Sequence, residues 1–400
     1  MQARFLPIWT FRAARVTACS MSILSDIRLI RRPLAGFAAI GICWGVFAGC
    51  VPAIKAQVAL SDGAFGAAML VSTYGAILAM WLAPWAEERL RALAMPLFTA
   101  LLGLGFLLPG LAGDWGQFAG AMLLCAAAAG TVDVAMNAQL SQLEARSGRP
   151  LMNLAHGGYS LVYACAALAA GIARGAGVSI WGIFLGATGV TLVAALVARG
   201  GEVVVPQEET GSGSRAPLPW GIIALAGVVI CIGFMAEQAT EAWSALHLER
   251  NLGAGAVGGA LAPTLLGLTM GAGRLSGQGL IRRLNGAGVL GAGAGLAALG
   301  SVIAALAPTA LIGWIGFAVL GFGVSVLAPM AYAWLGARLT PQARARAISR
   351  ATVIGYTGFF MGPPMMGGLS ELFGLRASFG AVALLLLLVP LVLLPLMARR

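Results

Sequence analysis

Charged residues and paired cysteines are scarce in this sequence of 400 residues. Only 10% of the residues are charged, whereas 60% are apolar. A soluble domain of this size could not hide so much apolar surface, and its loops would carry more charge. The six cysteines form no Cys-x-x-Cys pair, and His156 and His247 are the only histidines. We therefore expect no structural metal site and no cofactor.

The apolar residues form long runs, which predict an all-α integral membrane protein. Runs of about 20 residues, the length that crosses a bilayer as a helix, recur between polar breaks. A β-barrel is excluded because the runs are continuous rather than alternating. The twelve expected spans are roughly 34–54, 64–84, 95–113, 117–140, 153–174, 179–199, 220–246, 254–276, 286–306, 309–335, 348–369 and 375–397.

A polar stretch divides the expected spans into two groups of six. Residues 200–219 contain three glutamates with several glycines, serines and prolines, a composition typical of a flexible linker. Basic loops recur at corresponding places in the two groups, which indicates a weak internal repeat. The expected parts are an N-terminal tail (1–30), a first six-helix bundle (31–199), a cytoplasmic linker (200–219) and a second six-helix bundle (220–400).

Basic residues determine the expected orientation. With both termini in the cytoplasm, all but four of the 25 Lys and Arg residues fall on the inner side. The four on the outer side are Lys55, Arg174, Arg250 and Arg376. Such a bias predicts cytoplasmic termini in a bacterial inner (plasma) membrane. The net charge of +11 then reflects contact with anionic lipid of the bilayer rather than nucleic acid, and we expect a monomer.

Acidic side chains within the expected spans mark a candidate transport site. Asp133 and Asn137 share one face of the fourth span, and Glu237 and Glu241 share one face of the seventh. A carboxylate facing lipid at mid-membrane would cost about 2.5–3.5 kcal/mol, so we expect these groups to face other helices or a wet cavity. Burial favours the neutral form of a carboxyl group. Asp133 is expected to take up and release a proton, with Asn137 and Glu237 holding the solute, unless Asp133 only stabilises the bundle.

Two further sets of residues are candidates for function. His156, Tyr159 and Trp44 lie within spans and could line the pathway, although each could equally be a packing residue. Charged loops on the inner side could gate the pathway, or could be solvated turns that fix the topology. The candidate gating residues are Glu87, Glu88, Arg89 and Arg91 after the second span, Arg146 and Arg149 after the fourth, and Arg274, Arg282 and Arg283 after the eighth.

Twelve spans split six and six, with basic loops after the second and eighth, resemble the major facilitator superfamily. Asp133-Val-Ala-Met-Asn137 and the run from Gly355 to Pro364 are similar to the fucose-permease-like branch of that superfamily. The resemblance implies two bundles that rock about a central cavity lined by spans 1, 4, 7 and 10. The sequence departs from the superfamily pattern after the eighth span, where Gln278 replaces an expected acid.

The favoured function is secondary active transport of a small polar solute, coupled to protons and operating by alternating access. It rests on buried acids without an equal number of buried cations. The alternative is proton-driven export of a cationic or amphipathic compound, with Glu237 and Glu241 as counter-charges. A sensor is disfavoured because no sizeable soluble domain remains. An enzyme is not expected, since the sequence lacks His-Glu-x-x-His and Gly-x-Ser-x-Gly motifs.

Overall fold

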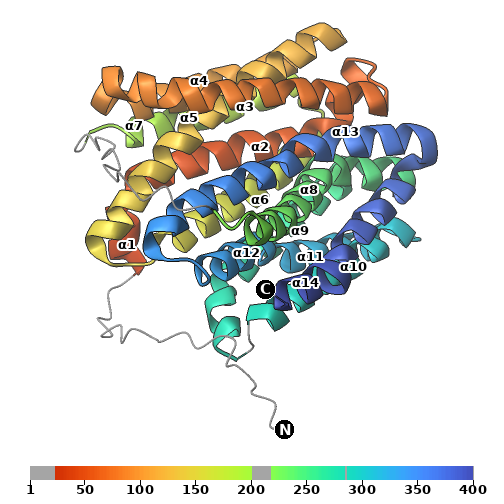
Figure 1. Cartoon of the computed structure of the whole chain (residues 1–400). Coiled ribbons are helices and arrows are strands. Elements are labelled where there is room, and N and C mark those ends of the chain that lie inside the picture. Colours follow the sequence, from red (N-terminus) through yellow and green to blue (C-terminus); the bar gives the residue numbers. More distant parts are fainter. Residues whose placement is uncertain (1–22, 201–217, 284–285, 400) are drawn as a thin grey trace.

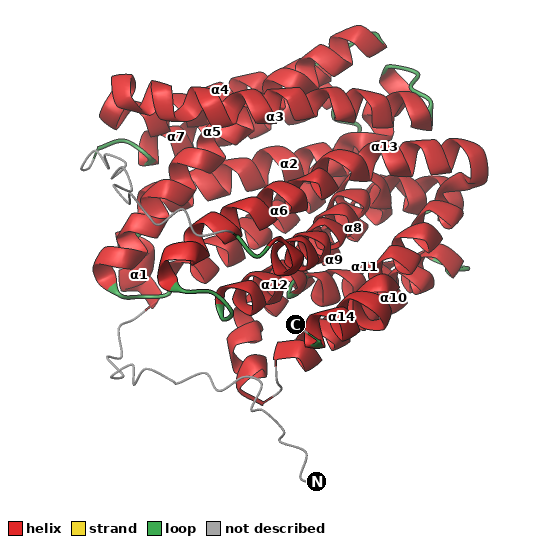
Figure 2. Cartoon of the chain, viewed as in Figure 1, coloured by secondary structure: helices red, strands yellow, loops and turns green. Residues whose placement is uncertain are grey.

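The computed structural model describes residues 23–200, 218–283 and 286–399, without the side chains of 276–283 and 341–342. Within these ranges the regular structure is entirely helical (Figure 2). Most of the predicted linker, 201–217, and most of the predicted tail, 1–22, lie outside the described residues. The end of the tail forms the short helix α1 (Ile23–Leu29).

The helices of the first half follow the predicted spans, with ends shifted by several residues. They are α2 (Arg31–Gln57), α3 (Asp62–Leu90), α4 (Ala94–Gly105), α5 (Trp115–Ser147), α6 (Leu151–Gly175) and α7 (Ile180–Val197). Short 3₁₀ turns, η1 (Arg91–Leu93) and η2 (Leu108–Gly110), flank α4.

The second half repeats this arrangement with two interrupted spans. Its helices are α8 (Trp220–Leu252), α9 (Gly255–Arg283), α10 (Gly286–Leu306), α11 (Ala310–Val324), α12 (Leu327–Gly336), α13 (Pro341–Leu388) and α14 (Leu394–Ala398), with the π-turn η3 (Val389–Leu393) before α14. The predicted tenth span is broken between α11 and α12. The long α13 contains two spans, because its backbone leaves the helical region at Gly374 (φ 80°, ψ 163°).

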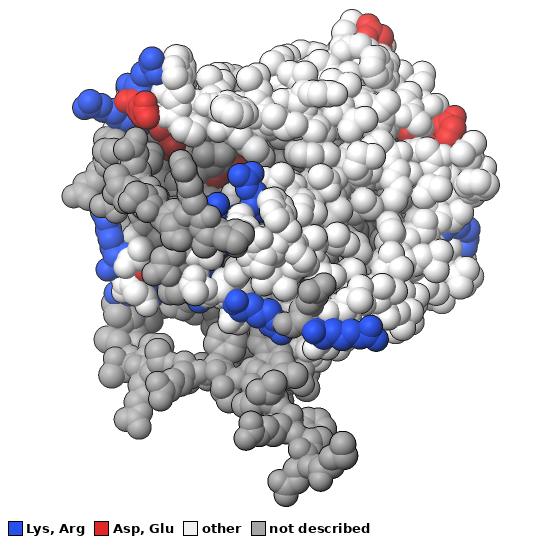
Figure 3. All heavy atoms as spheres, viewed as in Figure 1, with Lys and Arg blue, Asp and Glu red and all other residues white. Residues whose placement is uncertain are grey.

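Ten continuous segments of the described chain are long and apolar enough to cross a membrane. Two of them, Asp62–Gly110 with 49 residues and Ala343–Ala398 with 56, are each long enough to cross twice. The prediction of twelve transmembrane helices is therefore confirmed. In Figure 3 a broad part of the visible face carries no charged side chain, as expected of a surface that contacts lipid.

The helices form two six-helix bundles, α2–α7 and α8–α14, which meet along several helices. Across their interface α3 packs against α13, and α6 packs against α9. Figure 1 shows α1 at one end of the molecule and the bend of α13 at the other. We call these ends the α1 end and the Asp62 end, because Asp62 begins α3 beside the bend of α13.

Glycines on α2 bring α6 unusually close and so set the position of the tyrosines of α6. A Cβ atom on Gly45 would lie 2.3 Å from the backbone oxygen of Tyr163, and one on Gly49 would lie 2.7 Å from that of Ala167. Only glycine fits at such distances, and its spacing of four residues keeps these positions on one face of α2.

Candidate functional site

Polar side chains gather midway along the helices, where the two bundles meet. In the first bundle, Asn137 Nδ2 of α5 donates to Asp133 Oδ1 at 2.9 Å and to the Asp133 backbone oxygen at 2.9 Å. Both side chains are half-buried. The predicted sharing of one helical face thus becomes a direct hydrogen bond, in which the amide holds the carboxylate in place.

The second bundle contributes an ion pair that corrects the sequence analysis. Arg274 lies inside α9 rather than in a loop after it, and its Nη2 is 3.2 Å from Glu237 Oε1 of α8. Arg274 Nη1 also donates to Ser160 Oγ of α6 at 3.0 Å. The Arg274 and Glu237 side chains are only 18% and 11% exposed. A residue predicted to gate from a loop therefore compensates one of the buried acids and reaches across to the first bundle.

Glu241 lies one turn beyond Glu237 on α8 and has a different partner. Its Oε2 accepts a hydrogen bond of 2.9 Å from Gln238 Nε2, a neutral amide. Glu241 has no ion pair with another described side chain. The two acids of α8 therefore differ: Glu237 is charge-compensated, and Glu241 is not.

Tyr159 of α6 connects these groups. Its hydroxyl lies within electrostatic reach of Glu241, Glu237, Arg274 and Asp133. We call Asp133, Asn137, Tyr159, Glu237, Glu241 and Arg274 the central polar cluster. It draws on α5 and α6 from the first bundle and α8 and α9 from the second, so rocking of the bundles would change its geometry.

Two other predicted site residues lie at its margin or outside it. His156 packs edge-on against Phe37 of α2, with 4.9 Å between ring centroids, and feels the charge of Arg274. Trp44 packs edge-on against Phe47 and against Phe106 of the first bundle, at 5.6 and 5.2 Å. The packing interpretation that the sequence left open therefore describes the contacts of Trp44.

Asp133 and Glu237 lie at similar depths along their helices. The α5 helix does not end near Leu140 but continues to Ser147, so Asp133 lies about 21 Å from its end. Glu237 lies about 25 Å from the start of α8, at the same end of the molecule. Acids from both bundles can therefore act on one ligand.

The Asp62 end is held together by ion pairs between the bundles. Arg250 of α8 binds Asp62 through two contacts, Nη1–Oδ2 at 2.8 Å and Nη2–Oδ1 at 3.1 Å. Lys55 of α2 lies 2.7 Å from Asp62 Oδ1, and Ser370 of α13 donates to Oδ2. Asp62 thus accepts from three helices, two of them in the other bundle. We call these four residues the Asp62 network.

A second ion pair and a backbone contact reinforce this closure. Arg174 of α6 binds Glu249 of α8 through two contacts of 2.8 and 3.0 Å, and also donates to the Gly49 backbone oxygen at 2.7 Å. Glu371 Oε2 accepts from the Gly63 backbone nitrogen at 2.9 Å. Three of the four basic residues assigned to the outer side therefore bind acids at this end.

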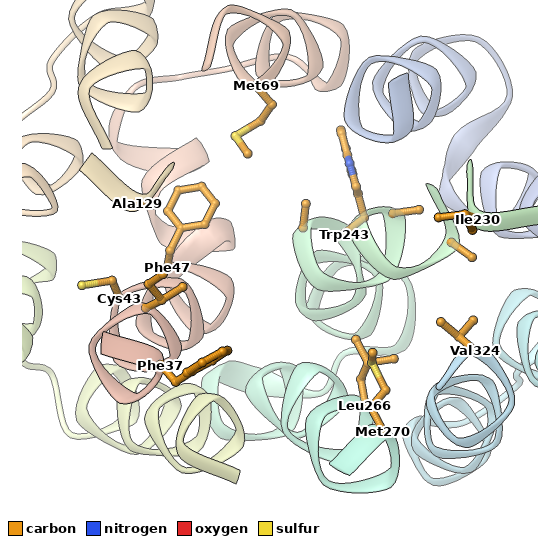
Figure 4. Packing of buried hydrophobic residues seen from close by; sticks show 14 of the residues in the cluster. Phe37, Cys43, Phe47, Met69, Ala129, Ile230, Trp243, Leu266, Met270 and Val324 are labelled. Carbon is orange, nitrogen blue, oxygen red and sulfur yellow. The ribbon is translucent and has the colours of Figure 1, made fainter. Parts of the chain in front are cut away.

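Aromatic rings lie beside the Asp62 network. Phe65 of α3 stacks on Phe118 at 5.9 Å and meets Trp243 of α8 edge-on at 5.2 Å, with Lys55 Nζ 5.3 and 5.6 Å from the Phe65 and Trp243 ring centroids. Figure 4 shows Phe47 and Met69 of the first bundle and Trp243 of the second extending toward the region between the bundles. The described structure is therefore closed at this end by both charge and apolar packing.

The predicted gating loops make different contacts. Arg149 binds Asp26 of α1 at 2.6 Å, which ties the loop to a helix of the same half. Arg89 lies over the Trp85 ring of its own helix at 4.1 Å. The other residues of these loops are placed as follows: Glu87 and Glu88 lie in the last turns of α3, Arg91 in η1 and Arg146 in the last turn of α5, while the side chains of Arg282 and Arg283 lie outside the described part.

No group of three metal-ligating side chains occurs among the described residues. The central polar cluster supplies hydrogen-bond donors, acceptors and charge of both signs.

Comparison with known proteins identifies the family. The family model for the Major Facilitator Superfamily matches residues 287–400. An uncharacterised MFS-type transporter of Yersinia pestis is 31% identical over 358 residues, covering 87% of this chain and 91% of that protein. The chain belongs to the major facilitator superfamily. The membrane protein MosC of Rhizobium meliloti is 25% identical over 347 residues, covering 84% of this chain and 82% of that protein.

Solved structures of other transporters share the fold of this chain. A bacterial homologue of the human lysosomal transporter Spinster, inward-facing and occupied, superposes with a TM-score of 0.73 at 15% identity, covering 95% of this chain and 98% of the other. A variant of the nucleoside transporter NupG superposes with a TM-score of 0.75 at 11% identity, covering 92% and 99%. At such identities these likenesses describe the fold, and this superfamily member is an integral membrane protein of the transporter kind.

Proposed function

We propose that this chain is a proton-coupled secondary transporter of a small polar solute, and not an enzyme. The observation that carries the proposal is the central polar cluster, in which carboxylates from the two bundles lie within electrostatic reach of one tyrosine, midway along the helices. Because charge at this depth is costly, such groups persist where they bind ions or substrates. The solute and a proton would bind to the cluster alternately as the bundles rock.

The closed Asp62 end supports alternating access. If the termini lie in the cytoplasm of a bacterial inner-membrane protein, as the charge bias predicts, the Asp62 end is the outer side, and the structure is closed to the outside. The Asp62 network would then break when the transporter opens outward. Within the superfamily we assign the chain to the fucose-permease-like branch, on the Asp133-to-Asn137 motif, and we expect it to act as a monomer.

Among the acids, Asp133 and Glu241 are the candidates for proton exchange. Neither has an ion pair with a described residue, whereas Glu237 has Arg274. A buried carboxylate without a cation must be neutralised by a proton or by a ligand. Asn137 and Arg274 remain as donors that could hold hydroxyl or carbonyl groups of a solute.

The proposal is tested in liposomes that contain the purified full chain and a trapped pH-sensitive dye. Solutes are first chosen from sugars, amino sugars, amines and acids by their ability to raise the melting temperature of the protein. A solute that binds is expected to drive proton movement in liposomes with the native chain. Asp133→Asn should abolish this movement, while Asp114→Asn, which changes an exposed acid at the start of α5, should preserve it. Full proton movement with Asp133→Asn would show that this residue does not carry the proton.

Direction distinguishes the favoured function from its alternative, export of a cationic or amphipathic compound. The uncompensated carboxylates favour a cation as ligand but do not fix the direction of its movement. A deletion strain that becomes sensitive to toxic cations would indicate export. A strain that fails to accumulate the solute would indicate uptake.

A further inference from the structure

We propose that Glu241 of α8 and Tyr163 of α6 form a binding site for a primary ammonium group at the interface of the two bundles. The proposal rests on the proposed transport function and names the class of solute: a polar molecule that carries an ammonium group. The Glu241 carboxylate has no ion pair with a described residue, and the Tyr163 hydroxyl has no hydrogen-bond partner. An ammonium group would supply a positive charge to the first and a hydrogen-bond donor to the second.

Glu241 lacks a positive partner. Its one hydrogen bond with a described residue comes from the Gln238 amide, which donates to Oε2 at 2.9 Å. Oε1 has no hydrogen bond to any described residue. The nearby guanidinium of Arg274 is engaged by Glu237 and Ser160. An amide donor orients a carboxylate but does not cancel its charge.

Tyr163 lacks a hydrogen-bond partner. Its side chain is 1% exposed, and its hydroxyl makes no hydrogen bond in the structure. Buried hydroxyl groups are nearly always paired, so an unpaired one indicates a missing partner. Its hydroxyl lies within electrostatic reach of Glu241 above all, then of Tyr159 and Glu237. The unpaired Tyr163 hydroxyl therefore lies within the electrostatic field of Glu241 but is not hydrogen-bonded to it.

An ammonium group has the charge and the donors that Glu241 and Tyr163 lack. It has three donors, of which one would go to Glu241 Oε1, one to the Tyr163 hydroxyl oxygen and one to Tyr159. The rings of Tyr159 and Tyr163, whose centroids are 6.1 Å apart, also offer aromatic faces that attract a cation. A neutral hydroxyl group has a single donor and would leave the Glu241 charge uncompensated.

The balance of charge around Tyr159 points the same way. Three carboxylates and one guanidinium lie within its electrostatic reach. Glu237 pairs with the guanidinium, so the remaining excess is negative. An anionic solute would add to this excess, while an ammonium group would reduce it.

The test compares solutes that differ only at the nitrogen. Glucosamine, glucose and N-acetylglucosamine form one set, and ethanolamine and ethylene glycol form another. Melting of the purified full chain is followed by tryptophan fluorescence at millimolar solute concentrations. We expect at least one ammonium compound to raise the melting temperature, while its hydroxyl or acetylated counterpart does not. The proposal is overturned if no ammonium compound stabilises the chain, or if the neutral counterparts stabilise it equally.

Two substitutions locate the site. Glu241→Gln should abolish stabilisation by the ammonium compound. Tyr163→Phe removes only an unpaired hydroxyl, so it should leave the melting temperature of the free protein unchanged while weakening ligand binding about tenfold or more. Asp114→Asn, at an exposed acid that begins α5, is the control and should bind as the native chain does. Unchanged ammonium binding by Glu241→Gln would also overturn the proposal.

These outcomes separate the site from the transport function. If ammonium compounds bind through Glu241 but move no protons in liposomes, the site stands and proton coupling fails. If neutral sugars bind and drive proton movement that Glu241→Gln leaves intact, transport stands and the ammonium site fails.

Discussion

Replacing Arg250 by Gln tests whether the Asp62 network holds one end of the transporter closed. Arg250 belongs to the second bundle and Asp62 to the first, so their ion pair exists only while the bundles meet at this end. The substitution removes the pair but leaves Lys55 and Ser370 on Asp62. We expect the Asp62 end to open more often.

The size of the effect follows from exposure. An exposed ion pair contributes about 0–1 kcal/mol, whereas removing one partner of a buried pair costs about 3–5 kcal/mol. The Arg250 side chain is 48% exposed and that of Asp62 is 7% exposed, so the pair lies between these limits at about 1–2 kcal/mol. A change of that size raises the open population roughly 5–30-fold. Asp62→Asn would be less informative, because it leaves Lys55, whose side chain is 3% exposed, without its carboxylate partner.

Cys50 is a natural reporter of this opening. It is fully buried in α2. The backbone oxygen of its neighbour Gly49 accepts a hydrogen bond from Arg174, which also binds Glu249 of the second bundle. In a variant that retains only this cysteine, a membrane-impermeant thiol reagent added on the Asp62 side should label Cys50 in proportion to the open population. Arg250→Gln should raise the labelling rate by the factor above.

A matched control uses an ion pair that stays within one half. Arg149 binds Asp26 of α1, so Arg149→Gln should leave the rate of Cys50 labelling unchanged. An unchanged rate in Arg250→Gln, with a melting temperature equal to that of the parent, would refute the gating role of the Asp62 network.

Three further substitutions have expected outcomes. Gly367→Ala places a Cβ 2.6 Å from a backbone oxygen of α3 across the bundle interface and should speed Cys50 labelling, whereas Gly368→Ala meets nothing within 4 Å and should not. Gly45→Ala drives a Cβ to 2.3 Å from a backbone oxygen of α6 and should lower the free energy of unfolding by about 1–3 kcal/mol, measured by thermal melting. Arg274→Gln leaves a buried carboxylate unpaired and should lower the melting temperature, and Arg274→Gln with Glu237→Gln should recover most of it; an additive double variant would contradict the pairing.

Sequence patterns were sufficient for the architecture because a membrane constrains them strongly. Each span must be predominantly apolar, so the hydropathy of the chain indicates the number of helices. Their ends are not, since a helix can continue beyond the apolar run. Arg274 shows the consequence: α9 continues past it to Arg283, although the charge of Arg274 was typical of a loop.

Candidate acids could also be found in the sequence, but their partners could not. Asp133 and Asn137 are four residues apart, and this spacing predicts their contact. Arg250 and Asp62 are 188 residues apart, and nothing local marks them as a pair. The few basic residues assigned to the outer side were used only to predict the topology. Their scarcity there is also informative about their contacts. A cation kept where the bias disfavours it is a candidate for a structural ion pair.

The contrast between Glu237 and Glu241 bears on how such a protein can exchange a ligand for a proton. Both acids lie on one face of α8, but only Glu237 has its charge cancelled, by a guanidinium that also reaches Ser160 in the other bundle. The uncompensated acid must be neutralised from outside the protein, and a proton and an ammonium group would compete for it. Competition between a proton and an ammonium group at Glu241 would couple the two species there, alongside the proton exchange proposed for Asp133. Coupling should therefore depend on Glu241 as well as on Asp133, while Glu237 and Arg274 should affect stability and the contact between the bundles.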